Sequence, residues 1–147
     1  MIQKLLFSVT TALALVAGPS ALHAAACGPD RDADIPIFED LKSLFIEGDY
    51  AGYIDKLGPL YRSSVSDLNQ QMVQFGQVFP NGFDVCETVL QRREAPGFSQ
   101  DIIVFSMKDS PDELVAMHLV GIRVAGKFTV ASFNFNTDLG LVFGGLH

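Results

Sequence analysis

Four side chains of this 147-residue sequence are of types that could perform acid–base chemistry in a pocket: His118, Asp101, Tyr50 and Tyr53. His118 shares one face of a predicted strand with branched aliphatic residues, where an imidazole could act as a general base or contact a ligand. Asp101 lies near the start of another predicted strand, where a carboxylate base could work beside a tyrosine oxyanion donor. Each also has a structural interpretation: a core imidazole with one hydrogen bond, a strand-edge carboxylate, and core tyrosines.

The familiar signatures of catalysis and cofactor binding are missing from the sequence. It contains no Gly-x-Ser-x-Gly nucleophile elbow, no phosphate loop and no dinucleotide fingerprint. A metal site would need two or three further ligands beside His118, but His147 is terminal and His23 lies in a segment that we expect to be removed. We therefore predict no catalytic residue, no metal and no cofactor.

An acidic segment near the beginning of the mature chain is similar to the start of a calcium loop. Aspartates at 30, 32 and 34 have the alternate spacing of such a loop. A calcium loop also needs glycine at its sixth position and glutamate at its twelfth, and here Ile35 and Leu41 stand there. The segment is therefore interpreted as a solvated lead-in.

Residues 1–26 show the three zones of a secretory signal peptide. Lys4 supplies the positive zone, an apolar run follows to Ala17, and small residues from Ala21 to Ala26 suit a signal peptidase. The apolar run is about 13 residues long, whereas a membrane-spanning helix needs about 20. We predict cleavage after Ala26, with Ala24 as the alternative, a periplasmic or secreted protein of residues 27–147, and no transmembrane segment.

The two cysteines of the sequence are Cys27 and Cys86. In an oxidising compartment an even pair is most simply a disulfide, which would tie the N-terminus to the body of the fold. One alternative is lipidation of Cys27, because residues 24–27 partly resemble a lipobox and the protein would then be anchored. The other alternative is two unpaired thiols.

The charge of the chain limits its partners. The formal net charge is −7, with 17 acidic and 10 basic residues. An acidic domain repels phosphate backbones, so we expect no nucleic-acid binding. The same charge would suit an acidic inhibitor that docks on a basic secreted enzyme.

The first half of the mature chain has the 3.6-residue period of helices. One helix is expected from Pro36 to Gly48, a second is capped by Asp49 and ends at Gly58-Pro59, and a third begins near Ser64 or Ser66 and ends before Pro80.

From Phe83 onward the period changes to two. We expect strands at 83–93, 101–108, 114–124 and 128–136, joined by short turns into an antiparallel meander, and a short edge strand in the tail 139–146. Helices followed by a meander give a single α+β domain in which three helices pack on one sheet face.

Both faces of the third strand are largely apolar, so the second face of the sheet also needs a cover. A homodimer partner would supply one, and a curved sheet wrapped on itself is the alternative. In the fourth strand Ser132, Asn134 and Asn136 form a polar row, which could line a pocket mouth or a wet outer face.

Two segments carry a resemblance to a known family: Phe45-Ile46-Glu47-Gly48-Asp49-Tyr50, and the closing strand from Gly126 to Phe135. With the order of elements they resemble the NTF2-like superfamily, which includes SnoaL-like and ketosteroid-isomerase-like domains. Phe128 stands where that last strand commonly has tryptophan. The resemblance implies a cone-shaped α+β fold with a pocket between helices and sheet, but no particular chemistry.

The sequence therefore favours an exported, non-enzymatic module that binds a small apolar ligand or a protein partner. An isomerase or hydratase that uses an acid–base pair near Asp101 and His118 is the alternative from another class. A filled interior would argue against catalysis, and a cavity with a convergent carboxylate or imidazole would favour it.

Overall fold

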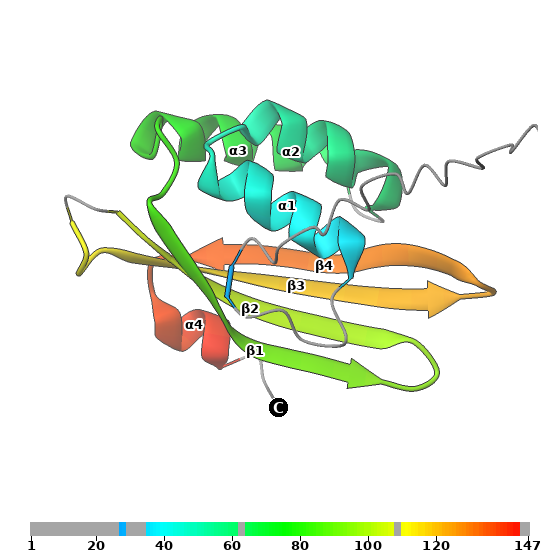
Figure 1. Ribbon diagram of the computed structural model, residues 1–147. Helices are drawn as coiled ribbons and strands as arrows, with labels where there is room; N and C mark the ends of the chain where they lie inside the picture. The colour runs from blue at the N-terminus through cyan, green and yellow to red at the C-terminus, as the bar shows by residue number, and fades with distance from the viewer. Residues whose placement is uncertain (1–26, 29–34, 62–63, 108–109, 145–147) are drawn as a thin grey trace, which may run out of the picture.

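The computed structural model of the protein describes residues 27–28, 35–61, 64–107 and 110–144. Three helices precede a four-stranded antiparallel sheet, and a short helix follows it, so the α+β prediction is confirmed. Helices α1, α2 and α3 cover one face of the curved, unclosed sheet, and α4 lies on the opposite face (Figure 1). We name these the inner and the outer face. The predicted signal peptide and the acidic segment at 30–34 lie outside the described residues.

The helices begin and end where the capping signals predict. Helix α1 (Pro36–Ile46) has proline in its first turn, and Gly48 follows it at a φ of 74°. Helix α2 (Tyr50–Leu57) is capped by Asp49, whose side chain accepts a 2.9 Å hydrogen bond from the Gly52 N–H. A 3₁₀ turn, η1 (Gly58–Leu60), leads toward α3 (Val65–Val78). None of the described helices is long and apolar enough to cross a membrane.

The four strands pair with their neighbours in chain order, as a meander must. They are β1 (Val85–Glu94), β2 (Phe98–Ser106), β3 (Leu114–Val124) and β4 (Lys127–Asn136). Strand β2 begins three residues earlier than predicted because pairing starts directly after the turn, with Glu94 opposite Phe98. The β3–β4 hairpin turns at Ala125 and Gly126, both at positive φ, as a two-residue turn requires.

The predicted edge strand in the tail is wrong, because residues Leu139–Phe143 form helix α4. Asp138 caps this helix by accepting a 2.9 Å hydrogen bond from the Gly140 N–H. Leu139 and Val142, three residues apart, pack against Ile102 and Ala116 on the outer face. The cap and the spacing of three favour a helical turn over a strand.

Aromatic side chains fill the space between the helices and the inner face. Phe45 of α1 stands at the centre, with six aromatic ring centroids within 4.9 to 6.2 Å of its own. These rings come from α2, from α3, from the loop before β1 and from the sheet: Tyr50, Tyr53, Phe75, Phe83, Phe105 and Phe135. The space around Phe45 is therefore filled by aromatic side chains rather than hollow.

The predicted disulfide between Cys27 and Cys86 is present, and it spans 59 positions of sequence. Both sulfurs are used by the bridge, so the thiol of Cys27 is not available for lipidation. The Cys27 carbonyl also accepts a 3.0 Å hydrogen bond from the Thr88 N–H of β1. The chain at Cys27 is thus fastened to β1 by a covalent bond and a backbone hydrogen bond.

Candidate functional site

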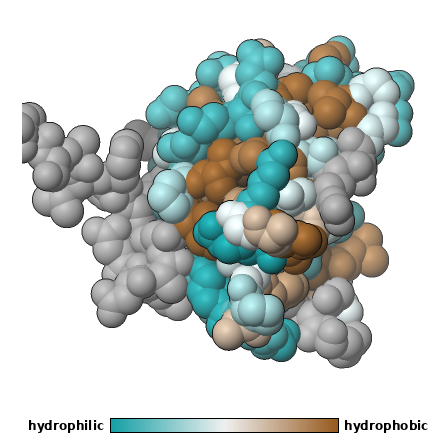
Figure 2. Space-filling view, turned by 90° about the vertical axis from the view of Figure 1, so that its right-hand side faces the viewer, coloured by the Kyte–Doolittle hydropathy of each residue, from teal (hydrophilic) through white to brown (hydrophobic). Residues whose placement is uncertain are grey.

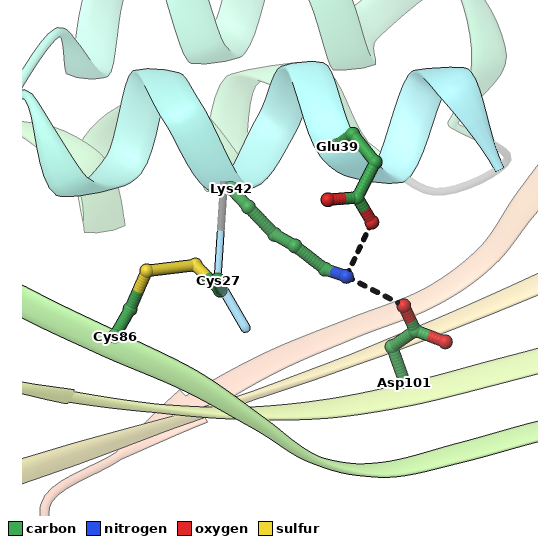
Figure 3. The surroundings of a disulfide bond; sticks show 5 residues. All are labelled: Cys27, Glu39, Lys42, Cys86 and Asp101. Carbon is green, nitrogen blue, oxygen red and sulfur yellow. Dashed lines mark hydrogen bonds and ion pairs between the residues drawn. A yellow bond between two sulfur atoms is a disulfide. The ribbon is translucent and has the colours of Figure 1, made fainter. Parts of the chain in front are cut away.

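Asp101 lies on the inner face of β2 and is completely buried. Its carboxylate meets two cations: Arg93 Nη1 lies 2.5 Å from Oδ1, and Lys42 Nζ lies 2.9 Å from Oδ2. The first contact is also a hydrogen bond, whereas the second is an ion pair without hydrogen-bond angles. Figure 3 shows Lys42 reaching from α1 down to Asp101, beside the disulfide.

Glu39, one turn before Lys42 on α1, completes the group, with 2.5 Å between its Oε1 and Lys42 Nζ. We call Glu39, Lys42, Arg93 and Asp101 the buried ion cluster. It contains two anions and two cations, so its formal charges cancel. A buried carboxylate that is enclosed by two cationic side chains suits a structural role better than that of a substrate base.

The hydroxyl groups of the two candidate tyrosines form hydrogen bonds within the fold. Tyr50 donates a 2.7 Å hydrogen bond to the Phe79 carbonyl, and Tyr53 donates to the sulfur of Met117 at 3.5 Å. Burial raises the pKa of Tyr50 to about 12. Burial, and secondarily Tyr61, raise the pKa of Tyr53 well above its usual value. Both hydroxyls therefore stay protonated and bonded inside the fold.

His118 lies on the other side of the sheet from these residues. It pairs with Ile102, whereas Asp101 pairs with Leu119, so the two candidates project from opposite faces. His118 is half-buried, and its Nε2 lies 2.7 Å from Nε2 of Gln100. Burial lowers its pKa, so the neutral imidazole accepts from the Gln100 amide. The sheet thus separates the histidine from Asp101 and both tyrosines.

Four surface grooves of about 250 to 420 Å³ lie elsewhere on the described residues, and none of the four is lined by His118 or by the buried ion cluster. Within the described ranges no three His, Cys, Asp or Glu side chains gather as metal ligands would.

The outer face of the sheet has a composition of its own. No Asp, Glu, Lys or Arg projects from it along β2, along β3, or along β4 between Thr129 and Asn136. Its side chains are apolar or neutral polar: Phe98, Gln100, Ile102, Val104, Ser106, Leu114, Ala116, His118, Val120, Ile122, Val124, Thr129, Ser132, Asn134 and Asn136. Among the described elements, only α4 contacts this face, near Ile102 and Ala116.

Sequence reasoning did not find the partners of Asp101. Lys42 gave one signal, because it lies four residues after Phe38 and three before Phe45, on the apolar side of its helix. A lysine placed there must meet an anion inside the protein. Arg93 gave a weaker one, since an arginine can hold an anion but a charged residue near a strand end is ordinarily solvated.

Comparison of the chain with models of protein families, with curated proteins and with solved structures found no match.

Proposed function

We propose that this chain is an exported, non-enzymatic protein-interaction module of NTF2-like architecture, and that its outer sheet face binds a second copy of the chain. The uncharged part of that face, along β2, β3 and β4 from Thr129 onward, carries the proposal, whereas β1 places Glu87, Arg92 and Glu94 at its margin. The chain has a net charge of −7. Even so, β2, β3 and the part of β4 from Thr129 to Asn136 direct only neutral side chains outward. Depletion of charge is the compositional mark of an interface core.

A second copy is the partner that fits the charge of the protein. Two strongly acidic molecules repel one another unless the surfaces that meet carry little charge. The acidic residues of the described chain lie on the helices, on β1, inside the ion cluster and in loops, so two outer faces can approach without opposing carboxylates at their centre. Neutral donors and acceptors such as Gln100, Ser132 and Asn134 can pair across a twofold axis.

The interior supports a binding role over a catalytic one. The aromatic rings around Phe45 occupy the space between helices and inner face, and Asp101 is enclosed by Lys42 and Arg93. An enzyme of the isomerase kind needs a reachable base beside a cavity of ligand size. A surface that binds another protein requires neither a reachable base nor a cavity of ligand size.

Sedimentation velocity of the mature protein, residues 27–147, tests the proposal. We expect a dimer at micromolar concentration, and we expect Val120→Asp at the centre of the outer face to weaken it at least about a hundredfold, because two like charges would face each other. Val73→Asp is the matched control, since Val73 of α3 is 62% exposed on the helical side.

A dimer that survives Val120→Asp would move the interface elsewhere, and a monomer at every concentration would reject a second copy as the partner. Native mass spectrometry of the same sample reports any retained small molecule. Such a mass, lost when the interior is altered, would favour the ligand-binding interpretation instead.

A further inference from the structure

A trough runs along the free edge of β4, beneath α3. Its first part is a groove of about 420 Å³, with Phe75, Phe133 and Phe135 below and the exposed side chains of Gln74 and Val78 at the rim. A second groove of about 360 Å³ lies next along the chain, at Phe79 after Val78 and at Thr137 after the end of β4, and we call the two grooves together the trough. The trough thus follows β4 to its C-terminal end.

The far end of the trough is acidic. Asp112 and Glu113 line the second groove together with Leu114, Val115 and Thr137. Both carboxylates belong to residues that are exposed. The trough therefore offers an apolar, aromatic floor at one end and two negative charges at the other.

The two edge strands of the sheet, β1 and β4, differ in how well they are protected against pairing with another strand. Strand β1 carries four charged residues, at 87, 92, 93 and 94, has a register irregularity between Thr88 and Leu90, and is covered where Thr88 donates to Cys27. Natural sheets guard their edges with such charges, bulges and covering segments, because unpaired backbone groups recruit other strands.

Strand β4 lacks these guards along the trough. From Ala131 to Thr137 it contains neither a charged residue nor a proline. The described chain bridges this edge only further back, where Tyr61 pairs with Val130. An edge strand directs alternate N–H and C=O groups outward, so this stretch presents backbone donors and acceptors beside an apolar floor.

We propose that this trough binds an extended segment of another protein, which adds antiparallel to β4 as a fifth strand. Its backbone pairs with β4 between Ala131 and Thr137, and alternate apolar side chains lie on the aromatic floor. A lysine or arginine at its N-terminal end lies against Asp112 and Glu113. The site is separate from the outer sheet face and does not depend on the proposed dimer.

Nuclear magnetic resonance titration of the labelled mature protein tests the inference with a synthetic probe. The probe is an acetylated, amidated peptide of two lysines followed by three Val-Thr pairs. We expect its amide shift changes to gather at residues 131–137 and 71–79. A version with alternate amides N-methylated loses the pairing hydrogen bonds and should bind at least about tenfold more weakly, given about 1 kcal/mol for each bond.

Protein variants locate the site independently. Val78→Lys puts a cation on the trough rim, at a side chain that is 68% exposed, and should weaken the probe about tenfold, whereas Val73→Lys on the same helix should not. Asp112→Asn with Glu113→Gln should remove most of the salt dependence of binding. Val120→Asp should leave peptide binding unchanged, which separates this site from the dimer.

Equal binding of the N-methylated probe, shift changes away from β4, or no binding of the probe at millimolar concentration would each overturn the inference.

Discussion

The two faces of the sheet solve the problem of burial in opposite ways. The inner face holds ionised groups deep in the fold and gives each of them a partner of opposite sign, as Lys42 does for Asp101. On the outer face, no charged side chain projects from β2, from β3 or from the part of β4 between Thr129 and Asn136. Among the described elements only α4 contacts this face. The first face is covered by three helices (Figure 1), and the second would be covered by the proposed second copy.

Apolar residues are also exposed at the end of the molecule that bears the hairpin tips (Figure 2). Figure 2 shows apolar residues gathered between hydrophilic ones there, rather than a uniformly polar surface. Val124, near the tip of β3, is 54% exposed although it lies on the apolar outer face. The contrast shows that the buried charges of the inner side have partners of opposite sign within the chain, whereas the outward side chains of β2 and β3 are neutral.

The largest expected effect comes from the inner side, at the disulfide. Replacing both cysteines by alanine should lower the free energy of unfolding by about 4 kcal/mol, because a bridge that spans 59 positions strongly restricts the unfolded chain. Urea denaturation of the wild type and the double variant measures the difference.

Reduction of the wild type should reproduce the loss, and reduction of the variant should change nothing further. A loss below about 1 kcal/mol would mean that the inner side is closed by packing alone, without its covalent fastening.

The buried ion cluster comes next. Lys42→Met should lower the free energy of unfolding by about 3 kcal/mol, at the low end of the range for breaking a buried pair, because Arg93 remains on Asp101. The double variant Lys42→Met with Asp101→Asn should lose at least about 1 kcal/mol less than the two single losses added together, since each partner is costly mainly without the other.

Lys56→Met is the matched control for this cycle. Lys56 pairs with Asp40 at 2.7 Å on the surface, where both side chains are well exposed. Exposed pairs contribute at most about 1 kcal/mol, so the control should change stability little. Equal losses at Lys42 and Lys56 would remove the distinction between the buried cluster and the surface.

The sequence predicts the elements of this fold well because their signals are local. The Asp49 cap, Gly48 and the alternation along Leu114–Val124 each act within a few residues, and the structure has the corresponding elements. The tail was missed because its helix is short and is held by contacts with Ile102 and Ala116, which are distant in sequence.

The arrangement of the candidate site was beyond the sequence because it depends on register. One residue of slip decides whether a side chain points inward or outward. Asp101 lies opposite Leu119 and points to the helices, whereas Ile102 lies opposite His118 and points away. No local pattern fixes that pairing, so Asp101 and His118 could be named as candidates but not placed on opposite faces.

The smallest expected effect belongs to His118, the one ionisable side chain at the middle of the outer face among the described residues. Burial lowers its pKa in the folded protein below the usual value of about 6.5, so protons bind more readily to the unfolded chain. The free energy of unfolding should therefore fall as the pH drops from about 6.5 toward the lowered pKa, and this contribution should be constant above about pH 7.

Urea denaturation of the wild type and of His118→Gln at pH 5.5 and 7.5 isolates that contribution, since the carboxylates titrate alike in both proteins. The wild type should lose more stability on acidification than the variant, and its dimer should weaken more, because protonation places a charge among the neutral side chains that β2, β3 and β4 direct outward. Gln100, Ile102 and Asn134, its neighbours on that face, have no charge to offset it. An identical pH dependence of the two proteins would show that the imidazole stays solvated. That result would contradict the proposal that this part of the outer face is buried against a second copy.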